Sequence, residues 1–186
     1  MPSIATLGPS GSDSFRAACQ YDPEAEIVTF RKIADVLNAF EEGTVEKALL
    51  PVYNTREGEV KEYFRIASTM DERVWVDNVV LPIHLSLGSL EQTATDPSCI
   101  TTIVARNSVF RQCEEFISEH YPDATLMAVQ DIDKAMLSIQ VENRTDTAVI
   151  ESEELVKRYN FTLLAREVVS HNRTRFAVLS KKVSES

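Results

Sequence analysis

Apolar residues along this chain follow two alternating patterns. Residues 47–52 form a nearly continuous apolar run bounded by turn residues, which is typical of a strand covered on both faces. Residues 31–42 instead repeat apolar side chains at helical spacing, with Val36 and Phe40 on the same face. The chain therefore alternates between buried strands and amphipathic helices.

The same patterns predict the elements of the whole chain. Strands are predicted at residues 3–7, 26–29, 47–52, 73–87, 100–105, 125–129, 147–150, 163–170 and 176–180. Helices are predicted at about 15–19, 31–42, 59–70, 108–120, 131–141 and 152–159, with a loop at 90–98. Because strands and helices alternate in both halves, the predicted fold class is α/β with two similar lobes.

Polar turns follow two of the predicted strands. The first, residues 8–14, is rich in glycine and serine and leads into a helix whose first N–H groups can bind an anion. Ser12 or Asp13 also suits the N-cap of that helix, and the two roles are compatible. The second turn, residues 53–58, follows the strand at 47–52. Because ligands of open α/β sheets bind outside the carboxyl ends of strands, we expect both turns to line one crevice.

A third polar stretch, residues 171–176, precedes the apolar residues 177–179. It places an amide, a hydroxyl and a guanidinium just ahead of a predicted strand, where a scaffold can hold polar groups toward a ligand. Taken alone, the same residues are typical of a turn with a solvated charge. A functional interpretation therefore depends on the other stretches.

Composition narrows the possible partners. The chain has 186 residues, 44% of them hydrophobic and 26% charged, which is ordinary for a globular protein. Its formal net charge of −10 argues against nucleic acid or an anionic membrane as a partner. An anionic substrate must be bound by a local cluster of donors. We expect a cytoplasmic protein, because no apolar stretch approaches the roughly 18 residues of a membrane span and no basic segment precedes an apolar run at the start.

The cysteines and two isolated large side chains have structural interpretations. Cys19, Cys99 and Cys113 are far apart and lack metal-binding spacing, so we expect reduced, mostly buried thiols and no metal site. His84 and Trp75 lie among apolar strand residues, which favours a hydrogen-bonded histidine and a core tryptophan.

Several of these stretches, in this order, resemble the catalytic domain of prephenate dehydratases. They are Leu7–Ser14, Pro51–Thr55 with Gly58, Leu81–His84, Gln112–Cys113, Ala148–Ile150 and Asn172–Phe176. The resemblance covers about residues 3–180. It implies one prephenate dehydratase-like domain, similar to type II periplasmic binding proteins, with two βαβ lobes around a cleft. The lobes are expected at 1–78 plus 166–186 and at 79–165, and a homodimer is possible.

The resemblance also implies a reaction. That family decarboxylates and dehydrates prephenate, a dicarboxylate, to phenylpyruvate without a cofactor, and arogenate is the corresponding amino substrate that gives phenylalanine. Thr174 is implied to assist departure of the hydroxyl, and Asn54 matches an active-site position. The implied substrate-binding residues are Ser10, Gly11, Ser12, Ser14, Tyr53, Thr55, Arg106, Ser108, Arg175 and Phe176.

Several positions depart from the family pattern, including Ser12 and Asp13, which stand where the family commonly has threonine and phenylalanine. Tyr53 replaces a carboxylate, Thr55 replaces a serine and Ser108 replaces a glutamine. Tyr53 and Ser108 are expected to face Thr174 across the cleft. For Arg175 a structural role and a substrate carboxylate are both open, and Arg106 can bind a carboxylate or lie in solvent.

The sequence is therefore compatible with three functions. The first is a lyase of the prephenate dehydratase type. The second is a prephenate decarboxylase of an antibiotic pathway, which spares the ring hydroxyl and suits the altered residues and the lack of a regulatory domain. The third is a binding module without catalysis.

Overall fold

The computed structural model describes residues 1–70 and 73–181. The polar sequence of residues 181–186 predicts a frayed end, and nearly all of these residues lie outside the described ones. The chain forms two compact units, Met1–Pro82 with Arg173–Ser186 (unit 1) and Ile83–Asn172 (unit 2). Both crossings come later in the chain than the predicted lobe boundaries. The reason is that Pro82 still pairs with Arg173, so both residues belong to the sheet of unit 1.

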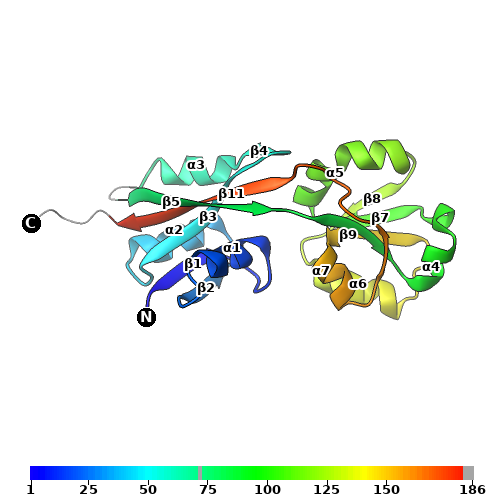
Figure 1. Cartoon of the computed structure of the whole chain (residues 1–186), viewed down its shortest axis with the longest axis horizontal. Coiled ribbons are helices and arrows are strands. Elements are labelled where there is room, and N and C mark those ends of the chain that lie inside the picture. Colours follow the sequence, from blue (N-terminus) through cyan, green and yellow to red (C-terminus); the bar gives the residue numbers. More distant parts are fainter. Residues whose placement is uncertain (71–72, 182–186) are drawn as a thin grey trace, which may run out of the picture. The chain divides into compact units, whose positions relative to one another are not determined.

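Unit 1 is a mixed sheet flanked by helices (Figure 1). Its strands are β1 (Ser3–Leu7), β2 (Glu26–Phe30), β3 (Lys47–Asn54), β4 (Gly58–Glu59), β5 (Arg73–Pro82) and β11 (Arg173–Lys181). Its helices are α1 (Asp13–Tyr21), α2 (Ile33–Glu41) and α3 (Lys61–Ala67). The strand order is β2-β1-β3-β11-β5, with β4 paired to β3. β1 runs parallel to β2 and β3, whereas β11 runs antiparallel to β3 and β5.

The helices of unit 1 cover both faces of this sheet. Helices α2 and α3 pack on one face, where Phe40 and Tyr63 join Leu50 in a buried cluster. Successive residues of a strand point to opposite faces of the sheet. Leu49 and Phe176 point to the other face, against which α1 packs; they are equally buried and lie outside that cluster. Burial on both faces explains the continuous apolar pattern of β3.

Unit 2 repeats the arrangement of strands between helices. Its strands are β6 (Leu85–Ser89), β7 (Thr102–Ala105), β8 (Thr125–Ala128), β9 (Thr147–Ser152) and β10 (Thr162–Ala165), in the order β10-β6-β9-β7-β8. Its helices are α4 (Glu91–Thr95), the 3₁₀ turn η1 (Pro97–Cys99), α5 (Asn107–His120), α6 (Ile132–Val141) and α7 (Glu153–Arg158). β7 is parallel to β8 and β9, while β6 is antiparallel to β9 and β10.

Three sequence predictions are corrected by this fold. The long β segment 73–87 is two strands in different sheets, because the chain passes between units after Pro82. The predicted loop 90–98 contains α4 and η1. The third polar stretch is not a turn between strands of 163–170 and 176–180: β10 ends at Ala165, and β11 already begins at Arg173 because it pairs with both neighbours.

Candidate active site

The topology of unit 1 brings the predicted polar stretches to the same end of its sheet. β1 and β3 are parallel, so the turn at residues 8–12 and the end of β3 both lie at the carboxyl ends of these strands. β11 is antiparallel to β3 and begins where β3 ends, with Thr174 directly opposite Asn54. Residues 10–14, Asn54 and Thr174, which are far apart in sequence, therefore lie at one end of the sheet.

Asn54 and Thr174 are joined by a side-chain hydrogen bond. Asn54 Nδ2 donates to Thr174 Oγ1 at 3.0 Å. Asn54 Oδ1 accepts from the backbone N–H groups of Arg56 at 2.8 Å and Glu57 at 3.0 Å. Because Asn54 is only 4% exposed and its oxygen is held by two donors, the orientation of its amide is fixed. The amide therefore presents an N–H to the Thr174 oxygen.

This pairing determines what the half-buried Thr174 hydroxyl can do. A hydroxyl has one hydrogen to donate and two lone pairs to accept with. Asn54 occupies a lone pair, and within the described part of the chain the Thr174 hydroxyl donates to no acceptor. Its hydrogen is thus available to a ligand, and the Asn54 N–H stabilises negative charge that develops on Oγ1 when the hydrogen moves.

The turn before α1 is held by its own hydrogen bonds. Ser12, not Asp13, is the N-cap: its hydroxyl accepts from the Phe15 N–H at 3.3 Å and donates to the Leu7 carbonyl at 3.2 Å. Gly11 has φ of 87°, a conformation that favours glycine, and Ser10 and Gly11 are exposed.

The first turn of α1 supplies donors to an anion. The N–H groups of the first two residues of a helix, here Asp13 and Ser14, have no partner within the helix and point outward from its N-terminus. The Asp13 carboxylate would oppose an anion there, but Arg16 forms an ion pair with it. Ser14 is nearly buried, at 8% exposed.

Two predicted substrate-binding residues lie away from Thr174. Tyr53 pairs with Arg175, which pairs in turn with Val80, so these three stand in one row across the sheet. Successive strand residues point to opposite faces, so Arg175 and Tyr53 do not share the face of Thr174 and Asn54. The expectation that Tyr53 faces Thr174 across a cleft is wrong, because both belong to the sheet of unit 1.

Phe176 and Thr55 each make a structural contact, although Thr55 is exposed. Phe176 shares the face of Thr174 but is 1% exposed, so the structure gives it a packing role rather than the predicted contact with a ligand. Thr55 accepts from the Arg173 N–H through its hydroxyl at 2.9 Å.

Unit 2 places a second group of polar residues at the carboxyl ends of its parallel strands. Arg106 follows β7 and Glu151 lies near the end of β9. Arg106 Nε and Nη2 each donate to the Glu151 carboxylate at 3.1 Å, which makes a bidentate ion pair. The Ser152 N–H donates to the same carboxylate at 3.0 Å. The Glu151 side chain is 6% exposed. Arg106 is thus charge-balanced by a protein carboxylate that the sequence analysis missed.

Helix α5 begins beside this ion pair. Ser108, the position of the family glutamine, lies in its first turn, where backbone N–H groups are available to an anion. Gln112, one turn further, accepts from Asn172 Nδ2 at 2.6 Å, and Asn172 is 4% exposed. The Asn172 side chain is therefore committed to a structural contact within unit 2.

The three thiols differ in their surroundings. Cys113 is fully buried, whereas Cys19 is half-buried and Cys99 is exposed, so the expectation of mostly buried thiols is only partly right. Burial, with a smaller contribution from the nearby Glu151 charge, raises the pKa of Cys113 to about 12.

Alkylation by iodoacetamide at pH 8 should label Cys99 first and leave Cys113 unlabelled in the folded protein. The thiolate is the reactive form, and a pKa of about 12 makes it scarce at Cys113. Mass spectrometry of digested protein measures the labelling, and unfolded protein, in which all three cysteines should react, is the control. Labelling of folded protein at Cys113 as fast as at Cys99 would contradict the burial.

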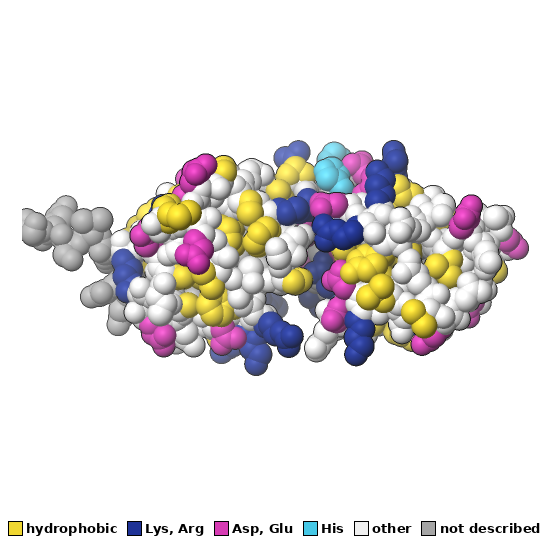
Figure 2. Space-filling model, turned by 90° about the horizontal axis from the view of Figure 1, so that it is seen from below, with side chains coloured by type: hydrophobic (Ala, Val, Ile, Leu, Met, Phe, Trp, Pro, Cys, Tyr) yellow, Lys and Arg dark blue, Asp and Glu magenta, His cyan; other side chains and the backbone are white. Residues whose placement is uncertain are grey.

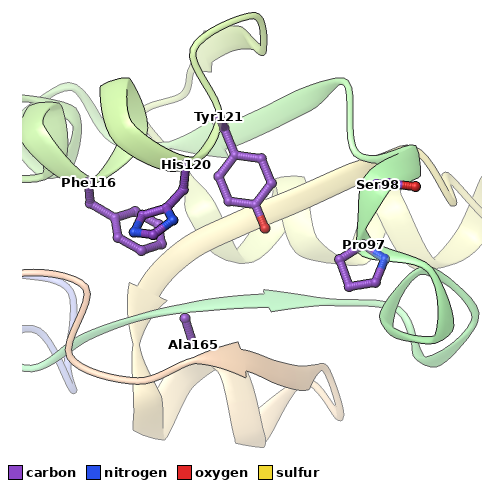
Figure 3. A pocket seen from close by; sticks show the side chains of 6 residues that line it. All are labelled: Pro97, Ser98, Phe116, His120, Tyr121 and Ala165. Atoms are coloured by element: carbon purple, nitrogen blue, oxygen red, sulfur yellow. The ribbon is translucent and has the colours of Figure 1, made fainter.

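A separate hollow of about 360 Å³ lies in unit 2 (Figure 3). Phe116, His120 and Tyr121, at the C-terminal end of α5, form one side, facing Ala165 of β10, with Pro97 and Ser98 of η1 beside them. Arg106 precedes the opposite end of α5, and a helix of this length spans about 20 Å. This hollow is therefore not part of the polar group around Glu151.

The sequence-based expectations for metal sites, membrane-spanning helices, His84 and Trp75 can be compared with the described residues. Among residues 1–70 and 73–181, no group of three or more His, Cys, Asp or Glu side chains could hold a metal ion. No helix in the same residues is long and apolar enough to cross a membrane. Both acidic and basic side chains are visible on the face in Figure 2. His84 pairs with Glu167 at 2.8 Å, whereas Trp75 is 42% exposed and is not the core residue predicted.

The fold and the polar ends of the two sheets define a class of α/β proteins built from two units with parallel strands between helices. A periplasmic substrate-binding protein of an ABC transporter from Coxiella burnetii shares this fold, with a TM-score of 0.54 and 13% identity over 97% of this chain and 84% of that one. A family model described as prephenate dehydratase matches residues 4–184, so the chain belongs to the prephenate dehydratase family.

One curated relative and one solved structure are also similar to this chain. The bifunctional chorismate mutase/prephenate dehydratase of Escherichia coli K12 is 30% identical over 96% of this chain and 47% of its own length. The crystal structure of the Arthrobacter aurescens prephenate dehydratase in complex with L-Phe has a TM-score of 0.77 at 20% identity, over 98% of this chain and 61% of that one. The chain thus spans about half the length of this bifunctional relative.

Proposed function

We propose that this chain is a lyase that decarboxylates and dehydrates prephenate, or the related arogenate, to the aromatic product. Membership of the prephenate dehydratase family supports the reaction class. The observation that carries the proposal is the Asn54–Thr174 pair, in which the threonine oxygen accepts a hydrogen bond and its hydrogen is available. A leaving hydroxyl requires such a donor.

The proposed chemistry is a redox-neutral elimination. The bond between the ring and its carboxylate breaks, and its electron pair enters the ring as carbon dioxide leaves. The hydroxyl at the opposite end of the ring departs, takes its proton from Thr174 Oγ1 and leaves as water, and Oγ1 regains a proton from solvent. Thr174 donates a hydrogen bond to that departing oxygen, and the Asn54 N–H stabilises the charge that develops on Oγ1. The gain of aromaticity drives the step, which requires no cofactor.

Each unit has one helix N-terminus whose donors suit a carboxylate. The N–H groups at the start of α1 in unit 1 and of α5 in unit 2 each suit a carboxylate, and each lies beside the carboxyl end of a parallel strand. Arg106 is balanced by Glu151, so in this proposal the pair shapes and orients the start of α5 rather than supplying a net positive charge.

Incubation of the purified chain with prephenate, followed by ¹H NMR, tests the proposal. We expect phenylpyruvate at a rate well above that of prephenate in buffer alone. A non-aromatic keto acid that retains the ring hydroxyl would instead identify a decarboxylase. Unchanged prephenate and unchanged arogenate, with saturable binding of either, would identify a binding module. Homodimerisation and a cytoplasmic location stay predictions, the first of which sedimentation would test.

A further inference from the structure

Pairing between β3 and β11 continues for one residue beyond the end of β3, and the acceptor there is unusual. The Thr55 N–H donates to the Arg173 carbonyl at 3.0 Å, as in a regular antiparallel pair. In the reverse direction, the Arg173 N–H donates at 2.9 Å to the Thr55 hydroxyl rather than to a backbone carbonyl. A side chain thus substitutes for one half of a backbone pair.

The turn after β3 explains why a side chain is needed. Asn54 Oδ1 accepts from the N–H groups of Arg56 and Glu57, so the chain bends away from the sheet directly after Asn54. Beyond that bend the strand no longer supplies a regular row of carbonyls. The Thr55 hydroxyl restores an acceptor where Arg173 requires one.

The contact between the Arg173 N–H and the Thr55 hydroxyl also affects how Thr174 is held. Arg173 immediately precedes Thr174, and the residue two positions after Thr174, Phe176, is fixed in the core at 1% exposure. The backbone that carries the Thr174 hydroxyl is therefore held by core packing at Phe176, by pairing with β5 and, on the β3 side, by Thr55. Loss of the Thr55 acceptor would loosen only the β3 side.

We infer that Thr55 is a positioning residue for Thr174, acting through the backbone of Arg173 and not through the substrate. The consequence for catalysis rests on the proposed function, whereas the positioning of Arg173 does not. A shift of Oγ1 by a fraction of an ångström would misalign its hydrogen with the leaving oxygen while leaving substrate binding nearly intact. The role requires a hydroxyl on Cβ, which serine also supplies.

Thr55→Val and Thr55→Ser test the inference, because valine keeps the shape and removes the acceptor whereas serine keeps the acceptor. Amide hydrogen exchange at Arg173, followed by NMR, should accelerate in Thr55→Val by about two- to tenfold, which corresponds to the net free energy of one hydrogen bond. In Thr55→Ser the exchange rate should stay unchanged. With prephenate as substrate, kcat should fall by a similar factor in Thr55→Val with KM nearly unchanged, and Thr55→Ser should restore it.

Two results would overturn the inference. Unchanged exchange at Arg173 in folded Thr55→Val would show that the hydroxyl does not hold this amide. A Thr55→Ser variant as impaired as Thr55→Val would show that the hydroxyl is not sufficient to position Thr174, which contradicts the inference. If the parent chain does not convert prephenate, the proposed function fails, while the exchange experiment still decides whether Thr55 positions Arg173.

Discussion

Replacing Thr174 with valine is expected to lower turnover of prephenate by about 10²- to 10⁴-fold, the usual contribution of a positioned proton donor. Valine has nearly the same shape, so the pairing of β11 with β3 and β5 should persist. The substitution removes both the hydrogen that is available to the leaving oxygen and the acceptor of the Asn54 N–H. Steady-state kinetics at saturating prephenate measure the effect.

Thr174→Ser is the matched control, since it keeps the hydroxyl and loses only a methyl group. It should retain most of the activity and, because it keeps the acceptor of the buried Asn54 N–H, should have a melting temperature at or above that of Thr174→Val. If Thr174→Val turned over prephenate at the parental rate, the hydroxyl would have no part in the reaction. A loss in Thr174→Ser as large as that in Thr174→Val would show that the hydroxyl alone is not sufficient for turnover.

Asn54→Asp should lower kcat by about a hundredfold or more, the usual cost of removing one donor that stabilises developing charge. A carboxylate oxygen in place of Nδ2 would accept from the Thr174 hydroxyl and turn its hydrogen away from the substrate. The other oxygen would still accept from Arg56 and Glu57, so the turn should remain. The new negative charge should also raise KM for a dicarboxylate.

Asn54→Ala serves as the comparison because it removes both functions of the side chain. We expect a similar loss of kcat together with a lower melting temperature, since two backbone N–H groups lose their acceptor. Thermal unfolding of the two variants separates the roles. An Asn54→Asp variant with parental kcat would show that the direction of the hydrogen bond to Thr174 is unimportant.

Local sequence was sufficient for several features of the site. The glycine and serine residues before α1 predicted a capped helix start, because capping depends on residues within one turn, although only the structure chose Ser12 over Asp13. The order of motifs, rather than any one of them, pointed to Asn54 and Thr174. The structure adds that these two form a direct hydrogen bond, which neither motif contains by itself.

The predictions for Tyr53 and Arg106 failed because they depend on contacts between residues that are far apart in sequence. The face that Tyr53 occupies depends on its register with Arg175 and on an irregularity in that register between Arg175 and Phe176, which no local pattern encodes. Arg106 was expected to meet solvent or a substrate, but its partner Glu151 is 45 positions away. The sequence did contain one indication of this partner, since Glu151 follows directly after the apolar residues of its strand. A carboxylate so close to the core requires a partner, which predicts a basic residue beside it.

The most direct test of the central claim compares the parent chain with Thr174→Val on prephenate, quantifying carbon dioxide and phenylpyruvate in the same reaction. Thr174 is proposed to assist loss of the hydroxyl in a step that also expels carbon dioxide. The parent should therefore release the two products in equal amounts, and both should fall together in Thr174→Val. Release of carbon dioxide by the parent without phenylpyruvate, or parental rates in Thr174→Val, would contradict the account.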